Sequence, residues 1–378
     1  MSRHAIIFGM SCTPHRRRSL VGGVAALAWL VLGLFAGGAR AALPAEVEAA
    51  LQRARVPSEA VAVVLQEVGS TRSLLAQQDK ALFNPASLAK LLTTQAALEL
   101  LGPSWTWSTP VWLSGSVADG VLEGSLVIKG SGDPKLVLER VWLLLRRVQL
   151  LGVREIRGDI VLDRSAFAAP PGAAADFDGD ATRPYNVQPD ALLLNFKAVS
   201  YSFVPQPGRG VALVLADPPL AATEVQPTVR LAATPCDDWR GALKADFSDA
   251  RRVRFAGVYP VACGEMNWPV ADAEPASYNA RLIEALWRDM GGKLAGRVLD
   301  GAAPLDVKPS FESKSAPLAD VVRDINKYSN NVMAQQLFLT LALQRQPGQP
   351  ATPDAARAVL RDWLAARVGE LPPGLQLD

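Results

Sequence analysis

The feature that most constrains the fold is a long strand-rich segment enclosed between helical ones. The segment 87–101 is apolar enough for a buried helix, and Gly102-Pro103 stops it. From 105 to about 303, apolar and polar residues alternate in short runs between Gly, Pro and Asp, which predicts strands and turns. This pattern predicts a helical domain interrupted by a β-rich insertion. The helices that follow the insertion are expected at 316–328, 331–343 and 352–368.

Shorter elements are predicted before and inside the insertion. A helix at 45–55 and two strands at 60–68 and 73–78 precede the helix 87–101. Inside the insertion, one long helix at about 134–151 and an irregular stretch at 168–182 interrupt the strands. The strands are expected at 111–117, 120–129, 153–163, 199–204, 211–216 and 253–258.

Residues 1–41 have the layout of a cleavable signal peptide. Three arginines at 16–18 precede an apolar run from 20 to 36, and the small-residue exit Ala39-Arg40-Ala41 predicts cleavage after Ala41. The alternative is an uncleaved membrane anchor, because the run approaches the roughly 20 residues that span a bilayer. In both cases the body of the protein is expected outside the cytoplasm.

Removing residues 1–41 changes the charge of the chain and the chemistry open to it. The segment carries five of the 39 Lys and Arg residues, none of the 37 Asp and Glu residues, and both histidines, so the remainder has a net charge of about −3. No basic stripe remains, and we expect no nucleic-acid partner. Without histidine, a Ser-His-Asp triad, a Cys-His pair and His-ligated zinc or iron sites are excluded.

Cys236 and Cys263 are the two cysteines that remain when Cys12 leaves with the signal. An even pair in an oxidising compartment favours a disulfide between them. The alternative is two buried thiols that never meet, because the sequence does not fix their separation.

Two polar patterns carry candidate chemistry. Ser87 and Lys90 stand at i and i+3 of one predicted helix, so their side chains share a face. A lysine amine whose pKa is lowered by burial can act as the base for a serine hydroxyl; the alternative is that Ser87 only caps the helix. The second pattern, Ser329-Asn330-Asn331, lies between two predicted helices. Its hydroxyl and amides suit proton relay and carbonyl binding, or an ordinary helix start.

No cofactor or metal motif accompanies these patterns. The sequence contains no phosphate-binding P-loop, and Gly130-Ser131-Gly132-Asp133 lacks the third glycine of a dinucleotide site. Asp178 and Asp180 are interpreted as members of a solvated loop rather than as a calcium site. We therefore expect no cofactor and no metal.

The Ser-x-x-Lys pattern at 87–90 and the Ser-x-Asn pattern at 329–331 have the order of the first two boxes of penicillin-binding proteins and serine β-lactamases. With five longer segments, they resemble the D-alanyl-D-alanine carboxypeptidase/endopeptidase family of class C low-molecular-mass penicillin-binding proteins, peptidase family S13. The 238 residues between Lys90 and Ser329 match the large insertion of that family. The resemblance covers about 45–378. The segments are 84–98, 126–136, 158–167, 183–195 and 316–339.

The resemblance implies the fold class and the activity. The fold is expected to be α/β, of the penicillin-binding or serine β-lactamase-like transpeptidase type, with parts at 42–104, 105–303 (the insertion) and 304–378. The implied function is serine-type hydrolysis of the D-Ala-D-Ala bond in peptidoglycan stem peptides, in the periplasm, through an acyl-enzyme. β-Lactam antibiotics are the implied acylating inhibitors.

The resemblance also implies roles for single residues. Ser87 is the expected nucleophile and Lys90 its general base, and Ser329 relays the proton to the leaving amine. Asn331 positions the substrate amide. Two further residues are implied to border the pocket for a stem-peptide side chain, namely Asp163, whose alternative is a strand-end turn residue, and Phe167.

The third family box, Lys-Thr-Gly, does not occur after Asn331. In the family, its strand supplies a cation for the substrate carboxylate and one N–H of the oxyanion hole. We therefore expect a C-terminally truncated domain with missing strands and little hydrolase activity. The alternative is a non-catalytic periplasmic protein that binds peptidoglycan or a partner. A β-lactamase is disfavoured, because class A enzymes have the two boxes much closer together.

Overall fold

The structure is a computed structural model that describes residues 43–169 and 172–377. The signal peptide predicted at 1–41 lies outside the described residues. The chain divides into two compact units at the Ala86–Ser87 junction, and each is described by itself. Among the helices of the described residues, none combines the length and the apolar character needed to cross a bilayer.

The first unit contains the predicted helix and strand pair. Helix α1 (Ala45–Arg53) is followed by strands β1 (Val63–Gln66) and β2 (Ser73–Gln77). The two strands pair antiparallel, with Val63 opposite Gln77. The predicted elements are confirmed, with ends shifted by at most three residues.

In the second unit, a seven-stranded sheet is built around the hairpin of β3 (Ser108–Ala118) and β4 (Val121–Lys129). Asp119 and Gly120 form its two-residue turn, and both have positive φ, as such tight hairpins require. Strand β4 also pairs in parallel with β5 and β6, and β3 pairs with β17. The remaining strands of this sheet are β5 (Glu155–Ile156), β6 (Ile160–Asp163), β15 (Lys293–Leu294), β16 (Val298–Asp300) and β17 (Phe311–Lys314).

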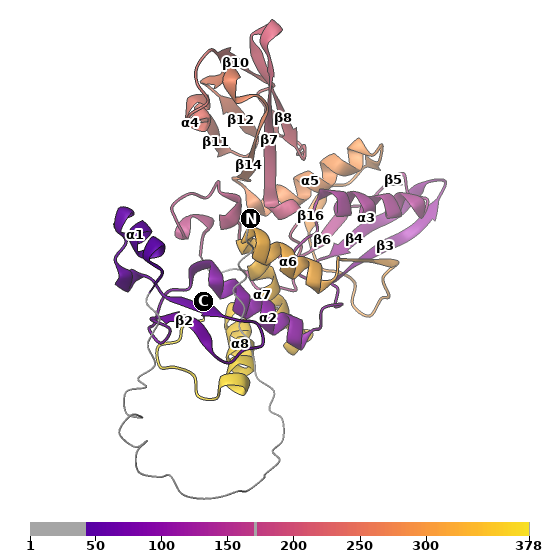
Figure 1. The fold of residues 1–378 in the computed structure, drawn as a ribbon. Coiled ribbons are helices and arrows are strands. Elements are labelled where there is room, and N and C mark those ends of the chain that lie inside the picture. The colour runs from indigo at the N-terminus through magenta and orange to yellow at the C-terminus, as the bar shows by residue number, and fades with distance from the viewer. Residues whose placement is uncertain (1–42, 170–171, 378) are drawn as a thin grey trace, which may run out of the picture. The chain divides into compact units, whose positions relative to one another are not determined.

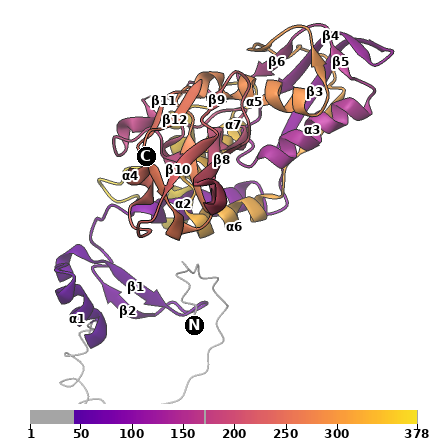
Figure 2. The same ribbon diagram turned by 90° about the horizontal axis from the view of Figure 1, so that it is seen from above.

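Helix α3 (Leu138–Leu150) lies beside this sheet (Figure 2). Its buried residues Val141, Leu144, Leu145 and Val148 follow the i, i+3, i+4, i+7 spacing of one helix face. They belong to one apolar core with strand residues such as Leu126. The helix expected at 134–151 is therefore present, but it begins four residues later.

A five-stranded sheet and a three-stranded sheet form the rest of the insertion (Figure 1). The larger sheet has the order β13-β10-β8-β7-β14, and the smaller one β11-β12-β9. The larger sheet contains β7 (Ala198–Gln206), β8 (Val211–Asp217), β10 (Thr228–Ala232), β13 (Val258–Pro260) and β14 (Met266–Ala271). The smaller sheet contains β9 (Glu224–Val225), β11 (Ala245–Asp249) and β12 (Arg252–Phe255), and the short helix α4 (Trp239–Leu243) precedes β11.

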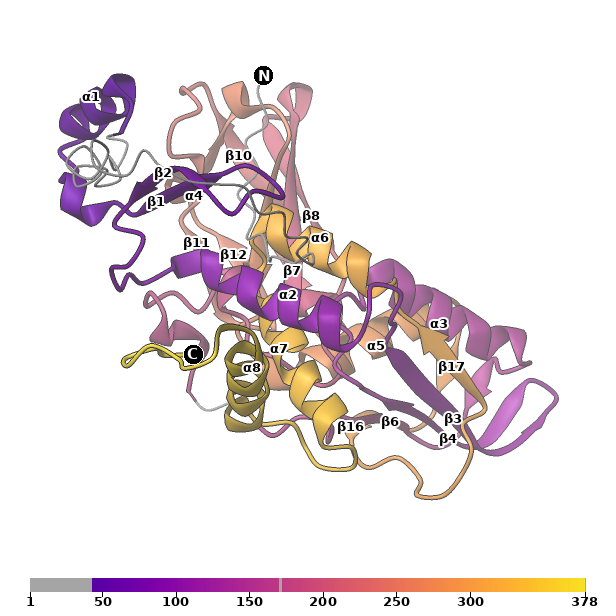
Figure 3. The same ribbon diagram turned by 60° about the horizontal axis from the view of Figure 1, so that its bottom comes forward.

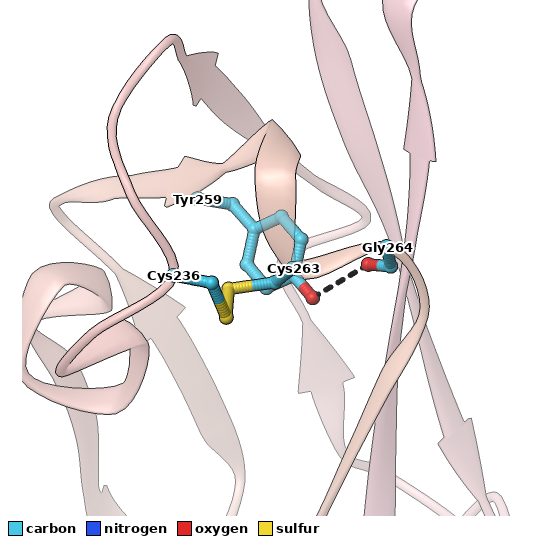
Figure 4. Close-up of a disulfide and its surroundings, with 4 residues drawn as sticks. All are labelled: Cys236, Tyr259, Cys263 and Gly264. Atoms are coloured by element: carbon cyan, nitrogen blue, oxygen red, sulfur yellow. Dashed lines mark hydrogen bonds between the residues drawn. A yellow bond between two sulfur atoms is a disulfide. The ribbon is translucent and has the colours of Figure 1, made fainter.

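A disulfide joins Cys236 to Cys263, with their Cα atoms 4.9 Å apart (Figure 4). Beside it, the Tyr259 hydroxyl donates a hydrogen bond of 2.8 Å to the Gly264 carbonyl. The Tyr259 ring stacks on Phe203, with centroids 5.4 Å apart. The bridge therefore closes a loop beside the aromatic core of this part of the insertion.

Four helices form a separate apolar core (Figure 3). Helix α2 (Ala89–Leu100) packs against the three helices that follow the insertion. The Trp107 indole N–H, which is buried, donates to the Thr340 hydroxyl at 3.0 Å and ties the start of the insertion to this bundle. The helices after the insertion are α6 (Leu318–Tyr328), α7 (Asn331–Arg345) and α8 (Pro353–Val368), close to the predicted ranges.

Helix α5 (Pro275–Asp289) was not predicted from the sequence, although it is 15 residues long. Its buried Tyr278, Leu282, Ile283 and Leu286 have helical spacing, which is the signal that identifies it. Strand β17 lies beyond residue 303 but pairs with β3, so this sheet continues past the boundary expected for the insertion. The division at 105 and 303 stays a prediction.

Candidate active site

Ser87 and Lys90 come together at the start of helix α2. A 3-10 turn over Ala86–Leu88 leads directly into the helix, so Ser87 lies one turn before Lys90. The Lys90 ammonium nitrogen Nζ lies 3.1 Å from Ser87 Oγ and donates to it. Ser87 is exposed and Lys90 is half-buried, which leaves the hydroxyl accessible to a ligand.

Ser329 completes a cluster of three side chains with Ser87 and Lys90. It ends helix α6 in the left-handed conformation, with φ 52°, and the chain then turns into α7. Its Oγ donates to Ser87 Oγ at 2.8 Å and accepts from Lys90 Nζ at 3.3 Å. We call Ser87, Lys90 and Ser329 the Ser-Lys-Ser cluster, in which each member contacts the other two.

Contacts between α2 and α6 hold the cluster together. Thr94, one turn after Lys90, exchanges hydrogen bonds with Asn326, one turn before Ser329, at 3.4 and 3.2 Å. Ala96 and Ala97 of α2 are fully buried, and such small residues let neighbouring helices approach closely. The two helix ends are therefore fixed relative to each other by contacts one turn from the site.

The electrostatics of Lys90 suit a base. Partial burial lowers the pKa of its ammonium from the ordinary value of 10.5. Among the described residues, Lys90 forms no ion pair with a carboxylate that would oppose this shift. A larger fraction of the free amine is therefore present at neutral pH than for an exposed lysine.

The side chains of the two asparagines after Ser329 form different hydrogen bonds. Asn330 caps helix α7, because its side-chain oxygen accepts from the Met333 N–H at 3.0 Å. Asn331 is the first residue of α7, and its Nδ2 donates to the main-chain carbonyl of Tyr185 at 3.3 Å. The capping alternative thus holds for Asn330, while the amide of Asn331 faces the loop that carries Tyr185.

That loop is organised by Asp178. Its carboxylate accepts hydrogen bonds from the Tyr185 hydroxyl at 2.7 Å, from Arg183 at 2.9 Å and from Asn186 at 2.6 Å. Hydrogen bonds from these side chains keep the pKa of Asp178 below its ordinary value, the Tyr185 hydroxyl having the largest effect. Asp178 therefore fixes the Tyr185 segment that contacts Asn331. Tyr185 was not singled out from the sequence.

Asp163 and Phe167 lie in other surroundings. Asp163 ends β6, is buried, and accepts from the N–H groups of Ser165 and Ala303 at 2.9 and 2.8 Å. Burial alone would raise its pKa, but the hydrogen bonds and Lys129, 3.7 Å away, hold the pKa below the ordinary value. Such contacts are those of a strand-end residue. Within the part of the chain that the structure describes, no hydrogen bond joins Asp163 to the Ser-Lys-Ser cluster, and its substrate role stays a prediction.

Phe167 is also buried and belongs to one apolar cluster with Leu339 and Ala342 of α7. Leu339 lies eight residues beyond Asn331, which is about 12 Å along a helix. The structure therefore places Phe167 beside the middle of α7 rather than at the residue that faces Tyr185. Its role in binding substrate stays a prediction as well.

A buried charge cluster, made of Asp190, Arg164 and Lys197, supports α7 from the insertion. Lys197 Nζ lies 2.5 Å from Asp190 Oδ2, and Arg164 Nη2 lies 2.6 Å from the same oxygen. The main chain of Asp190 exchanges two hydrogen bonds with the Gln336 side chain of α7, at 2.9 and 2.8 Å. The sequence did not identify this cluster, because only the tertiary fold buries Asp190 and Lys197 and brings Arg164 to them.

The fold is that of a penicillin-binding protein. The crystal structure of penicillin binding protein 4 (dacB) from Haemophilus influenzae matches it with a TM-score of 0.64 at 22% identity, over 81% of this chain and 67% of that chain. A second crystal structure of the same protein, complexed with a novel beta-lactam, matches with a TM-score of 0.59. The expected fold class is confirmed.

Residues 43–369 match the model of the D-Ala-D-Ala carboxypeptidase 3 (S13) family, and the chain belongs to that family. It is 25% identical to D-alanyl-D-alanine carboxypeptidase DacB of Haemophilus influenzae over 68% of its length, and 26% identical to D-alanyl-D-alanine carboxypeptidase of Actinomadura sp. strain R39 over 81%. The chain spans 53% and 58% of the lengths of these relatives. The resemblance seen in the sequence is confirmed.

Proposed function

We propose that this chain is a serine-type D-Ala-D-Ala carboxypeptidase or endopeptidase that acts on peptidoglycan stem peptides. The observation that carries the proposal is the Ser-Lys-Ser cluster, in which a lysine with a lowered pKa contacts two serine hydroxyls. The identity of two relatives as D-alanyl-D-alanine carboxypeptidases supports the substrate. Serine acyl transfer of this type requires no histidine, metal or cofactor.

The geometry supports a separate catalytic role for each of the three side chains. Lys90, as the free amine, takes the proton from Ser87 Oγ while that oxygen forms a bond to the scissile carbonyl carbon. When the C–N bond breaks, the proton passes through Ser329 to the nitrogen of the departing D-alanine. Water then attacks the acyl-enzyme ester, with Lys90 again accepting a proton. Asn331, at the start of α7, is proposed to position the substrate amide.

No Lys-Thr-Gly box follows Asn331 in the 378 residues, and this bears on the expected rate. Loss of one oxyanion donor alone lowers rates by about 10²–10³-fold, and the cation for the substrate carboxylate would be absent as well. We therefore propose that the 378-residue chain reacts slowly by itself. The comparison is release of D-alanine from a stem pentapeptide by this chain and by the same chain extended with the C-terminal segment of the Haemophilus influenzae relative. Equal turnover would contradict the proposal.

The nucleophile is tested by reaction of the extended chain with a labelled penicillin and mapping of the adduct. A relative has been crystallised with a beta-lactam, which motivates the probe. Ser87→Ala is expected to abolish labelling, and Lys90→Ala to slow it by about 10²–10⁴-fold, because no other base among the described residues contacts Ser87. Ser116→Ala, an exposed serine of β3, is the matched control and should label normally.

The outcomes separate the two functions considered from the sequence. An adduct that persists in Ser87→Ala would contradict the assignment of the nucleophile. An extended chain that folds but forms no adduct would favour the alternative, a non-catalytic protein that binds peptidoglycan or a partner.

A further inference from the structure

A cavity of about 220 Å³ lies in the insertion, away from the Ser-Lys-Ser cluster. Strands β7, β8 and β14 of the five-stranded sheet line one side, and β9, β11 and β12 of the smaller sheet line the other. Most of its wall is apolar, and none of its lining residues belongs to the four-helix core. The apolar lining includes Val199, Ala216, Leu220, Val225, Phe247 and Val270.

The cavity contains a polar group without a protein partner. Tyr201 lines it and is only 5% exposed, yet its hydroxyl forms no hydrogen bond with the described residues. By contrast, the hydroxyls of the buried Tyr259 and Tyr278 donate to main-chain carbonyls at 2.8 and 2.9 Å. Burial, together with the charge of Asp272, raises the pKa of Tyr201 to about 12, so its hydroxyl is neutral at pH 7.

A concave space with mostly apolar walls and a few polar groups is the usual form of a small-molecule site. Tyr201 supplies one such polar group, because this residue lines the space and its hydroxyl has no hydrogen-bond partner among the described residues. An engineered apolar cavity of about 150 Å³ is known to hold benzene. A space of about 220 Å³ is therefore large enough for one ring or branched aliphatic group with a short polar arm.

The charges of the lining residues indicate the charge of the ligand's polar group. Two carboxylates, Asp249 and Asp272, line the cavity, whereas the lining contains no Lys or Arg. Asp272 is paired with Arg281 through Oδ1. Asp249 is exposed at the rim, where its carboxylate accepts a hydrogen bond from the Arg251 N–H and has no ion pair within the described part of the chain. Because Arg281 neutralises Asp272, the uncompensated charge of the lining is that of Asp249, and it favours a cation.

We propose that this cavity binds a small organic ammonium compound with an aromatic or branched aliphatic body. The body fills the apolar space between the two sheets. The ammonium group lies toward Asp249 and Asp272 and donates a hydrogen bond to the Tyr201 hydroxyl oxygen.

Three probes that share one apolar body test the proposal on the full chain. The probes are 2-phenylethylamine, 2-phenylethanol and 3-phenylpropionate, which are cationic, neutral and anionic at pH 7. The anionic probe is needed because Arg251 and Arg252 line a shallow depression that shares Asp249 with the cavity. Dissociation constants are measured by ligand-observed NMR titration. The amine should bind with a constant of about 1 mM or below, at least about fivefold tighter than the other two probes. Weaker binding of the amine, or equal or tighter binding of another probe, would overturn the proposal.

Variants locate the binding. Tyr201→Phe removes only the hydroxyl and should weaken amine binding about 3- to 10-fold, the effect of one hydrogen bond. Tyr259→Phe is the matched control, because it removes a hydroxyl of the same insertion that does not line the cavity. Ala216→Leu should fill the space and abolish binding. A Tyr201→Phe variant that binds as well as the parent, or an Ala216→Leu variant that folds and still binds, would overturn the proposal.

Asp249→Asn tests the proposal if the variants at the more buried positions do not fold. The side chain is exposed, and asparagine keeps an acceptor for the Arg251 N–H. This change should weaken binding of the amine about two- to fivefold and leave 2-phenylethanol unchanged. Unchanged binding of the amine would count against the proposed place of the ammonium group.

Discussion

Removal of the Asp190 carboxylate is expected to destabilise the second unit strongly. Only 2% of the Asp190 side chain and 6% of the Lys197 side chain are exposed, so the Asp190→Asn change leaves a buried ammonium without its counter-ion. Breaking a buried ion pair in this way costs about 3–5 kcal/mol. Arg164 suffers less, because it is partly exposed and also contacts Asp300 at 2.9 Å.

The free energy of unfolding is measured by urea denaturation, followed by tryptophan fluorescence. Asp354→Asn is the matched control: it also removes the carboxylate of an Asp–Arg pair, but that side chain is 91% exposed, and the change should have little effect. The double variant Asp190→Asn with Lys197→Met removes both charges and should be more stable than Asp190→Asn alone.

The pH dependence gives a further check of the same reasoning. Burial lowers the pKa of Lys197, and loss of Asp190, which raises it, should lower it further. At a pH below the ordinary lysine pKa, the unfolded chain then binds more protons than the folded one. The stability of Asp190→Asn should therefore rise between pH 7 and pH 9.5 relative to the parent. A loss below about 1 kcal/mol at pH 7, or a double variant no more stable than Asp190→Asn, would refute the reasoning.

Three other predictions concern different parts of the chain. Acylation of Ser87 by penicillin should become faster as the pH rises, because deprotonation of Lys90 supplies the base. The rate should level off below pH 10.5, since burial lowers the Lys90 pKa. A rate independent of pH between 6 and 10 would exclude Lys90 as that base. Replacing both Cys236 and Cys263 by serine opens a loop of 27 residues and should lower the stability of the insertion by about 3–4 kcal/mol in urea denaturation; two free thiols in the denatured, unreduced parent would contradict the bridge. Export should leave Ala42 as the N-terminal residue, and mass spectrometry that finds Arg16–Arg18 retained in a membrane fraction would instead support the anchor.

The cluster could be predicted from the sequence because its signals are local. Ser87 and Lys90 are one helical turn apart, and Ser329 lies at a helix–helix junction that the polar run Ser329-Asn330-Asn331 marks. The contact between the two patterns, across 242 residues, came only from the family resemblance. Helix positions outside the insertion were predicted closely, since their apolar periodicity is strong and their ends carry Gly, Pro or capping residues.

The supporting contacts could not be predicted, for physical reasons. The acceptor for Asn331 is a main-chain carbonyl of Tyr185, which any residue type supplies, so no sequence pattern marks it. Asp190 and Lys197 are close in sequence, but only the tertiary fold makes them buried and brings Arg164 to them. The Tyr201 cavity is likewise a property of how two sheets pack, and neither strand pattern reveals it.

The separation of Ser87 from Ser329 also has a consequence for synthesis. Ribosomes add about 5–20 residues per second, so the 238 residues between Lys90 and Ser329 take about 10–50 s to appear. During that time α2 exists without α6 and α7, and the face that carries Ala96 and Ala97 has none of the helix surface that later buries it. The nascent chain therefore exposes this apolar segment for tens of seconds, and a chaperone that binds such segments would act before Ser87 meets Ser329.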